Sequence, residues 1–159
     1  MGHREVDGLV WAKAAVSGPF GKSRARGVKA LGVRYESSVL KALSGHKAVG
    51  GKWFEFWDKN GHGWCQPDII IPGSKRVLVL EAKHSWVAEG HTQIDRLYRP
   101  VVESALGKEV VGIVVCKYLR EMPKETVVCS SLREALAKAL EGAVVVLAWN
   151  DKFGTGLMA

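Results

Sequence analysis

The chain has few cysteines and no long apolar run, and both absences exclude classes of protein. Its 159 residues include three cysteines, and no two of them have the CxxC spacing of a zinc or redox site. An odd number at these spacings also provides no disulfide framework. No apolar run approaches the roughly 20 residues of a membrane-spanning helix, and the opening "MGHREVDGLVW" lacks the apolar core of a signal peptide. We therefore expect a cytoplasmic protein.

Acidic residues are scarce in one stretch of the chain. The formal net charge is +7, and residues 22–52 carry eight basic side chains but a single acid, Glu36. Such a stretch is typical of a surface that binds nucleic-acid phosphates, although a solvated lysine-rich helix would show the same pattern. The residues expected to contact phosphates, without reading the base sequence, are Lys22, Arg24, Arg26, Lys29, Arg34 and Lys52.

Length and composition suit a single globular domain. The chain is 47% hydrophobic and 25% charged, and it contains no low-complexity tract and no repeat. Residues 1–26 mix glycine, serine and proline with basic residues, which predicts a mobile or loosely packed basic arm. We expect the domain to span residues 27–150, followed by a tail at residues 151–159.

The periodicity of the apolar residues predicts an α/β fold. Apolar steps of three and four from Val28 indicate a helix, and "KWFEFW" alternates as a strand does. Two strands, residues 68–71 and 76–83, are joined by "PGSK" and predict a hairpin; both are apolar at successive positions, as in the interior of a sheet. The remaining expected elements are a helix at 92–106 that Pro100 should kink, a strand at 109–116, a helix at 130–142 and a strand at 143–149. The order predicts a mixed sheet flanked by helices.

Three charged residues flank this apolar hairpin. If its turn is centred on the Gly-Ser pair, Asp68 lies opposite Val79, and Glu81 and Lys83 project from the same face. Asp68 and Glu81 are then diagonal neighbours, within the reach of one bridging divalent cation. Mg²⁺ prefers such oxygen ligands, Mn²⁺ is expected to substitute for it, and one of its waters can attack a phosphodiester. Lys83 would orient or deprotonate that water, or offset charge on the phosphate.

The motif formed by these residues resembles that of the PD-(D/E)xK nuclease superfamily. "PD" ends at Asp68, and "EAK" begins thirteen residues later at Glu81. The superfamily's core order, α-β-β-β-α-β, is also the order predicted for residues 28–116. The resemblance implies a restriction-endonuclease-like fold in which Asp68, Glu81 and the Ala82 carbonyl hold the metal.

The same resemblance assigns roles to two further residues. It implies that Glu36 on the first helix completes the metal site, and that Gln93 on the second helix orients the site. From the residues alone, two other readings stay open: the charges at the hairpin could simply mark strand ends and a turn, and Glu36 could be a solvated glutamate paired with a nearby base.

Within the superfamily, the chain is most similar to archaeal-type Holliday junction resolvases. The similarity lies in the basic segment near the amino terminus, in "R-x-E" at Arg34 and Glu36, and in a glutamine soon after the ExK strand. It implies a homodimeric endonuclease that cuts four-way DNA junctions by paired nicks during recombination and repair. The long arm and the elements after Cys116 depart from that pattern, and so does the missing serine before Asp68; a bacteriophage-encoded member would accommodate both departures.

The residues alone leave other functions open. The same centre would serve an exonuclease or a restriction-like nuclease, and a DNA-binding module without catalysis is a further alternative. Tyr98 resembles the tyrosine of the exonuclease QxxxY motif, but its distance from Gln93 is one residue too long, so we expect it in the core. The aromatic residues Trp53, Phe54, Phe56, Trp57 and Trp64 are expected in the core or a dimer contact, with stacking on splayed bases as the alternative.

Overall fold

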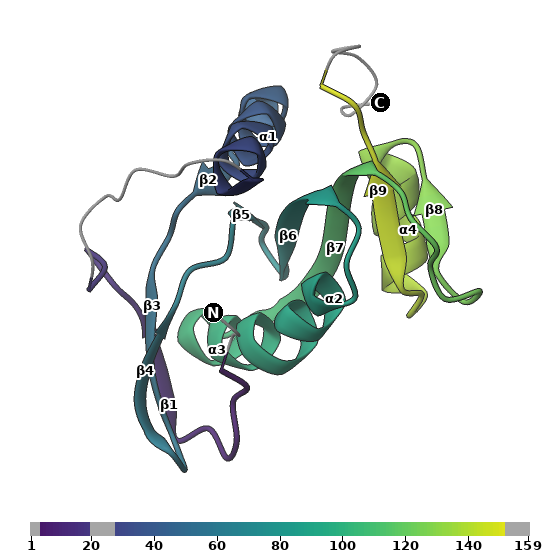
Figure 1. Ribbon diagram of the computed structural model, residues 1–159. Helices are drawn as coiled ribbons and strands as arrows, with labels where there is room; N and C mark the ends of the chain where they lie inside the picture. Colours follow the sequence, from purple (N-terminus) through teal and green to yellow (C-terminus); the bar gives the residue numbers. More distant parts are fainter. Residues whose placement is uncertain (1–3, 20–27, 152–159) are drawn as a thin grey trace.

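The computed structural model of the protein describes residues 4–19 and 28–151 and has a mixed α/β architecture (Figure 1). Its larger sheet has six strands in the order β2-β5-β6-β7-β9-β8. They are β2 (Val49–Gly50), β5 (Ile69–Pro72), β6 (Arg76–Ser85), β7 (Glu109–Tyr118), β9 (Val145–Ala148) and β8 (Val127–Cys129). The predicted α/β class, a mixed sheet flanked by helices, is confirmed. No helix within the described part of the chain is long and apolar enough to cross a membrane.

The long strands β6 and β7 form the centre of this sheet. They are parallel, β9 and β8 continue the parallel part, and β5 and β2 are antiparallel to their neighbours. Helices α1 (Val28–Ala42) and α4 (Leu132–Leu140) cover one face, and the segment from α2 (Glu89–Gln93) to α3 (Arg99–Leu106) covers the other (Figure 1). Leu78 and Leu80 pack on the first face, and Val77 and Val79 on the second. Burial on both faces, which the successive apolar positions predicted, is therefore confirmed.

Helix α1 packs on the sheet through only part of its predicted apolar stripe. Tyr35 and Val39 are buried, and Leu43 extends the stripe just beyond the helix, whereas Leu31 is 42% exposed. The Tyr35 hydroxyl donates to the Trp149 carbonyl oxygen at 2.9 Å. This bond ties the helix to the end of β9 and fixes its orientation over the sheet.

The second helical segment contains a π-helical turn, η2 (Ile94–Tyr98), between α2 and α3. The Arg99 N–H donates to the Ile94 carbonyl, five residues back instead of four. Pro100 follows at once in the same continuous helix and has no N–H to donate to the preceding turn; the Arg96 carbonyl accepts instead from the Val6 N–H at 2.9 Å. The predicted disruption near Pro100 thus takes the form of a wider turn before the proline. The helix also begins at Glu89, three residues before the predicted start.

A second, three-stranded sheet was not predicted. It has the order β1-β3-β4, from β1 (Trp11–Ala14), β3 (Phe54–Asp58) and β4 (Gly61–Cys65), and it lies against α3 (Figure 1). The interpretation of residues 1–26 as a loosely packed arm is wrong for residues 4–19, since β1 pairs with β3 and buries Ala12. The segment between β3 and Asp68 was not predicted to form a strand either. It contains β4, which follows a tight turn where Gly61 has φ +104°, a conformation that favours glycine.

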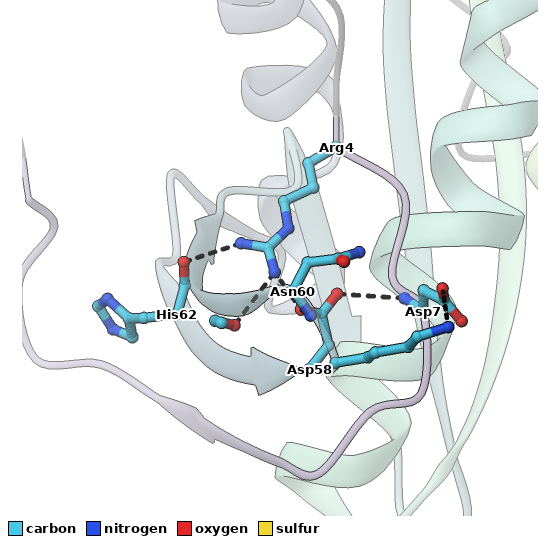
Figure 2. A network of polar contacts seen from close by, with 7 residues as sticks. Arg4, Asp7, Asp58, Asn60 and His62 are labelled. Carbon is cyan, nitrogen blue, oxygen red and sulfur yellow. Dashed lines mark hydrogen bonds and ion pairs between the residues drawn. The ribbon is translucent and has the colours of Figure 1, made fainter.

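An ionic network pins the amino-terminal segment to the β3–β4 hairpin (Figure 2). The Arg4 guanidinium pairs with the Asp58 carboxylate and donates to the His62 carbonyl at 2.8 Å. The backbone N–H groups of Asp7 and Asn60 donate to Asp58 at 3.1 and 2.9 Å. Burial raises the pKa of Asp58, but these N–H groups and Arg4 outweigh that effect and hold the pKa below its ordinary value. The carboxylate therefore stays ionised in a site that is closed to solvent.

Candidate metal and catalytic site

Asp68 and Glu81 meet directly across the β5–β6 pair. Ile69 lies opposite Leu80, so Asp68, one residue earlier, falls opposite Glu81 and not Val79. The predicted register is wrong by two residues because the turn is longer, with the Gly73 N–H bonded to the Arg76 carbonyl at 2.8 Å. A shift of two preserves the face of every side chain, so the expected convergence of the two carboxylates survives. The backbone N–H of Ala82 donates to Asp68 Oδ2 at 2.9 Å and fixes that carboxylate.

Helix α1 brings a third carboxylate, that of Glu36, to the same place. Burial raises the pKa of Glu36 to about 8, and the neighbouring charge of Asp68 and contact with its side chain add to the rise, while Lys83 partly offsets it. Burial and Asp68 likewise raise the pKa of Glu81 well above its ordinary value. Glu36 and Glu81 thus both lie beside Asp68, each at a place that disfavours its negative charge.

The buried carboxylate of Glu81 is incompletely satisfied. Its residue is 1% exposed, and within residues 4–19 and 28–151 its Oε1 atom has no hydrogen-bond partner. Its Oε2 atom lies 3.6 Å from Lys83 Nζ. An orphaned carboxylate oxygen beside two further carboxyl groups is a position where a cation would lower the electrostatic free energy.

Lys83 and Gln93 face each other from β6 and α2. Lys83 Nζ is 3.5 Å from Gln93 Oε1, a long contact, so Gln93 lies beside both the lysine and the carboxylates. The Gln93 amide donates to the Tyr98 hydroxyl at 2.5 Å, and that hydroxyl donates to the Gln66 carbonyl at 3.3 Å. Gln93 was expected to orient the site; the structure brings it to Lys83, and the orienting role stays a prediction.

Tyr98, which was expected in the core alone, also belongs to this chain of contacts. Its ring is buried as expected, and burial raises the pKa of its phenol. Its hydroxyl nevertheless reaches Gln93, because the π-helical turn brings residues five apart onto one side of the helix. In an α-helix, residues four apart lie on the same side. Gln93 and Tyr98 are five apart, and the wider turn of η2 brings them to the same side of the helix. Pro100 was the one signal that could have suggested this.

Of the six predicted phosphate contacts, three lie in the described residues: Lys29, Arg34 and Lys52. Lys22, Arg24 and Arg26 lie outside the described residues, and Lys29 lies in the first turn of α1. Arg34 is exposed on α1, and both it and Glu36 lie in the middle of this helix and not at its start. Lys52 donates to the Ala15 carbonyl at 3.2 Å, so it also connects the strand β3 region to the end of β1.

The donor atoms at this site suit Mg²⁺, but they do not form a closed cage. Carboxylate oxygens from Glu36, Asp68 and Glu81 are hard ligands of the type that Mg²⁺ prefers. In the part of the chain that the structure describes, no group of three or more His, Cys, Asp or Glu side chains is arranged as a metal site. A hexacoordinate Mg²⁺ usually keeps several waters, so it needs few protein ligands. The orphaned Oε1 of Glu81 is the feature that best fits a cation here.

Comparisons with known proteins assign this chain to no family. No protein-family model, no curated protein and no solved structure matches it. The resemblance to the PD-(D/E)xK superfamily therefore rests on the residues themselves and on their arrangement at the end of β5 and β6.

Proposed function

We propose that the protein is a Mg²⁺-dependent DNA nuclease that hydrolyses phosphodiester bonds. The observation that carries this proposal is the meeting of Asp68 with Glu36 and Glu81, beside Lys83, at one end of the β5–β6 hairpin. Carboxylates with raised pKa values next to a lysine are expected at a functional site, since they destabilise the fold when nothing compensates for them. The basic composition of residues 22–52 supports an anionic polymer as the substrate.

Each residue has a defined role in this proposal. Asp68 and Glu81 would hold the ion with the Ala82 carbonyl, and Glu36 would complete the set. When bound, Mg²⁺ supplies a Lewis acid for the scissile phosphate and a nucleophilic water. Lys83 positions or deprotonates the attacking water, or offsets charge on the phosphate in the transition state. Gln93 holds Lys83 through its Oε1 atom and is itself held by Tyr98.

A DNA-binding module without catalysis would not need this cluster. Exposed lysines and arginines suffice for phosphate contacts, and they carry no penalty of burial. Glu81 is instead 1% exposed, and within the described residues its Oε1 atom has no partner. Keeping such an unfavourable group supports a chemical role over a purely structural one.

The substrate class that we propose first is the four-way DNA junction, cut by a homodimer. This proposal rests on the similarity to archaeal-type resolvases at Arg34, Glu36 and the glutamine after the ExK strand. Two active sites related by a twofold axis would place symmetric nicks in opposite strands.

A second candidate is an exonuclease acting on linear DNA. The specific observation in its favour is the pairing of Gln93 with Tyr98 at 2.5 Å. Through the π-helical turn, these two residues stand in the relation that the exonuclease QxxxY motif has in an ordinary helix. Tyr98 thus supports this candidate, although the spacing in the sequence alone argued against it.

Cleavage of defined substrates tests both candidates. A four-way junction, a linear duplex and a single strand are incubated with wild type and with Asp68→Asn, Glu81→Gln and the control Glu121→Gln, whose side chain is exposed outside the site. We expect Mg²⁺-dependent cleavage that falls at least about a hundredfold in the two site variants and is unchanged in the control. Paired nicks confined to the junction support the resolvase, progressive shortening of linear ends supports the exonuclease, and wild-type inactivity with both Mg²⁺ and Mn²⁺ refutes the nuclease.

A further inference from the structure

The outer face of the β1-β3-β4 sheet carries a continuous group of aromatic side chains. Trp11 pairs with Trp57, and Trp57 pairs with His62, so these three lie in one row across the sheet. The next row contains Lys13, Glu55 and Trp64, and Trp53 extends β3 beyond it. We call this set of seven residues the aromatic face.

The rings of the aromatic face are in contact from one edge of the sheet to the other. The ring centroids of Trp11 and Trp57 are 4.5 Å apart, and those of Trp57 and His62 are 4.6 Å apart. Trp64 lies 5.5 Å from His62 and 6.4 Å from Trp53. Trp11 is 45% exposed and the His62 side chain 41%, so part of this surface is open to solvent.

The aromatic face is not needed to form the core. The opposite side of the same strands carries Phe54, Phe56 and Cys65, which are almost fully buried against α3 and the second layer of the core. An ordinary half-exposed sheet would alternate such residues with polar ones. Here tryptophans take the outer positions, which is the composition of a binding surface.

The charges on the aromatic face offset one another, so they do not oppose an anionic ligand. Lys13 Nζ lies 5.5 Å from the Trp11 ring centroid and 3.4 Å from Glu55 Oε1. His62 Nε2 lies 2.8 Å from the other oxygen of Glu55. The hydrogen bond with His62, together with Lys13, lowers the pKa of Glu55, so the one acid of the face is paired on both sides. The chain as a whole carries a net charge of +7.

The spacing of the rows suits bases that are not stacked on one another. Side chains on one face of a strand repeat about every 6.6–6.8 Å, twice the rise per residue. The bases of one duplex strand follow each other every 3.4 Å or so. Bases that meet successive rows must therefore be splayed apart, as they can be in a single strand and not in a duplex. Strand β4 also ends at Cys65, three residues before Asp68, so the face adjoins the catalytic carboxylates along the chain.

We propose that the aromatic face binds a single-stranded nucleic acid by stacking unpaired bases on Trp11, Trp57 and Trp64. The stacking supplies affinity with little base preference, because every base has a π-face. This surface is separate from the carboxylate site, and binding to it requires neither Mg²⁺ nor hydrolysis.

Binding of short single strands in a chelating buffer tests the proposal. Oligothymidylate and oligouridylate are titrated by fluorescence anisotropy against wild type, Trp11→Leu, Trp57→Leu and Trp11→Phe, with Leu140→Ala, 46% exposed on α4, as the matched control. We expect each leucine variant to weaken binding about fivefold or more, Trp11→Phe to restore most of it, and the control to match wild type. Comparison of the two oligonucleotides tells whether DNA or RNA is preferred.

The salt dependence separates stacking from phosphate contact. Loss of a stacking ring lowers the affinity at every salt concentration and leaves the slope of log K against log salt unchanged, whereas loss of a cation changes that slope. Leucine variants that bind as wild type does, or a duplex that binds as tightly as the single strands, overturn the proposal. So does a wild type that sediments as a dimer while Trp11→Leu sediments as a monomer, since a second copy then occupies the face. If the single strands bind in chelator but the wild type cleaves none of the junction, duplex and single-strand substrates in Mg²⁺ or Mn²⁺, the nuclease proposal alone is refuted and the stacking surface stands.

Discussion

Glu36 is the residue at which the proposed function and the stability of the fold oppose each other. Burial and Asp68 raise the pKa of its carboxyl group to about 8, so in the metal-free protein the group ionises only at alkaline pH, and there its charge is disfavoured. Glu36→Gln removes that charge at nearly constant size. We expect the metal-free variant to be more stable at alkaline pH by about 1 kcal/mol, after allowing for the partial exposure of the group, and to melt a few degrees higher. Cleavage should fall at the same time.

The control for Glu36→Gln is Glu121→Gln, whose side chain is exposed outside the site. Thermal melting with a chelator and single-turnover cleavage with Mg²⁺ are measured on both proteins. If the Glu36→Gln protein is less stable than wild type at alkaline pH, other groups in the fold already stabilise the charge of Glu36. The raised pKa of Glu36 would then no longer support a metal site.

Tyr98 allows a positioning role to be separated from a packing role. Tyr98→Phe keeps the buried ring and removes only the hydroxyl that lies between Gln93 and the Gln66 carbonyl. We expect kcat to fall about tenfold to a hundredfold with KM nearly unchanged, as for other groups that orient a catalytic side chain. A Gln93→Ala variant should show a similar loss, and the double variant little more. If Tyr98→Phe lowers the melting temperature but cleaves at the wild-type rate, the residue only packs.

At the scale of elements, the strand period of two was enough to predict which side chains share a face, whereas pairing between segments far apart in the sequence could not be predicted. Asp68 and Glu81 were expected on one face, and an error of two residues in the turn did not matter, because the period of a strand is two. The contact of Gln93 with Tyr98 was missed because a helix was given its ordinary period through η2. The pairing of β1 with β3 joins residues that are 40 to 46 positions apart, and no local pattern indicated it.

The ion pair of Arg4 with Asp58 is what we expect to hold β1 and the β3–β4 hairpin together. Arg4→Ala leaves the buried Asp58 carboxylate without its cation, and removal of one partner of a buried pair destabilises a protein strongly. Because Arg4 is about one third exposed, we expect a loss near the lower end, about 2–3 kcal/mol, in the free energy of unfolding in urea. Lys59→Ala breaks the exposed pair with Asp7 and should change stability by less than about 0.5 kcal/mol. Equal effects of the two variants would contradict this role.

For the whole molecule, two groups of carboxylates give the stability opposite dependences on pH. The pKa of Asp58 is lowered in the folded protein, so its contribution is present above the unfolded pKa of about 3.8 and is lost as the pH falls below it. The pKa values of Glu36 and Glu81 are raised, so the folded protein binds more protons than the unfolded chain, and stability falls as the pH rises from 4.5 to about 8. The metal-free protein should therefore be most stable near pH 4–5, more acidic than is usual.

Magnesium should reverse the second of these dependences. A cation that binds the ionised carboxylates of the folded protein adds stability in proportion to its occupancy, and it competes with protons for the same oxygens. We expect the melting temperature in Mg²⁺ to exceed that in chelator at pH 8, and the difference to vanish near pH 5. Glu36→Gln should flatten the metal-free slope between these values. A metal-free wild type whose melting temperature rises steadily from pH 5 to pH 8 would mean that these carboxylates are already compensated within the folded chain.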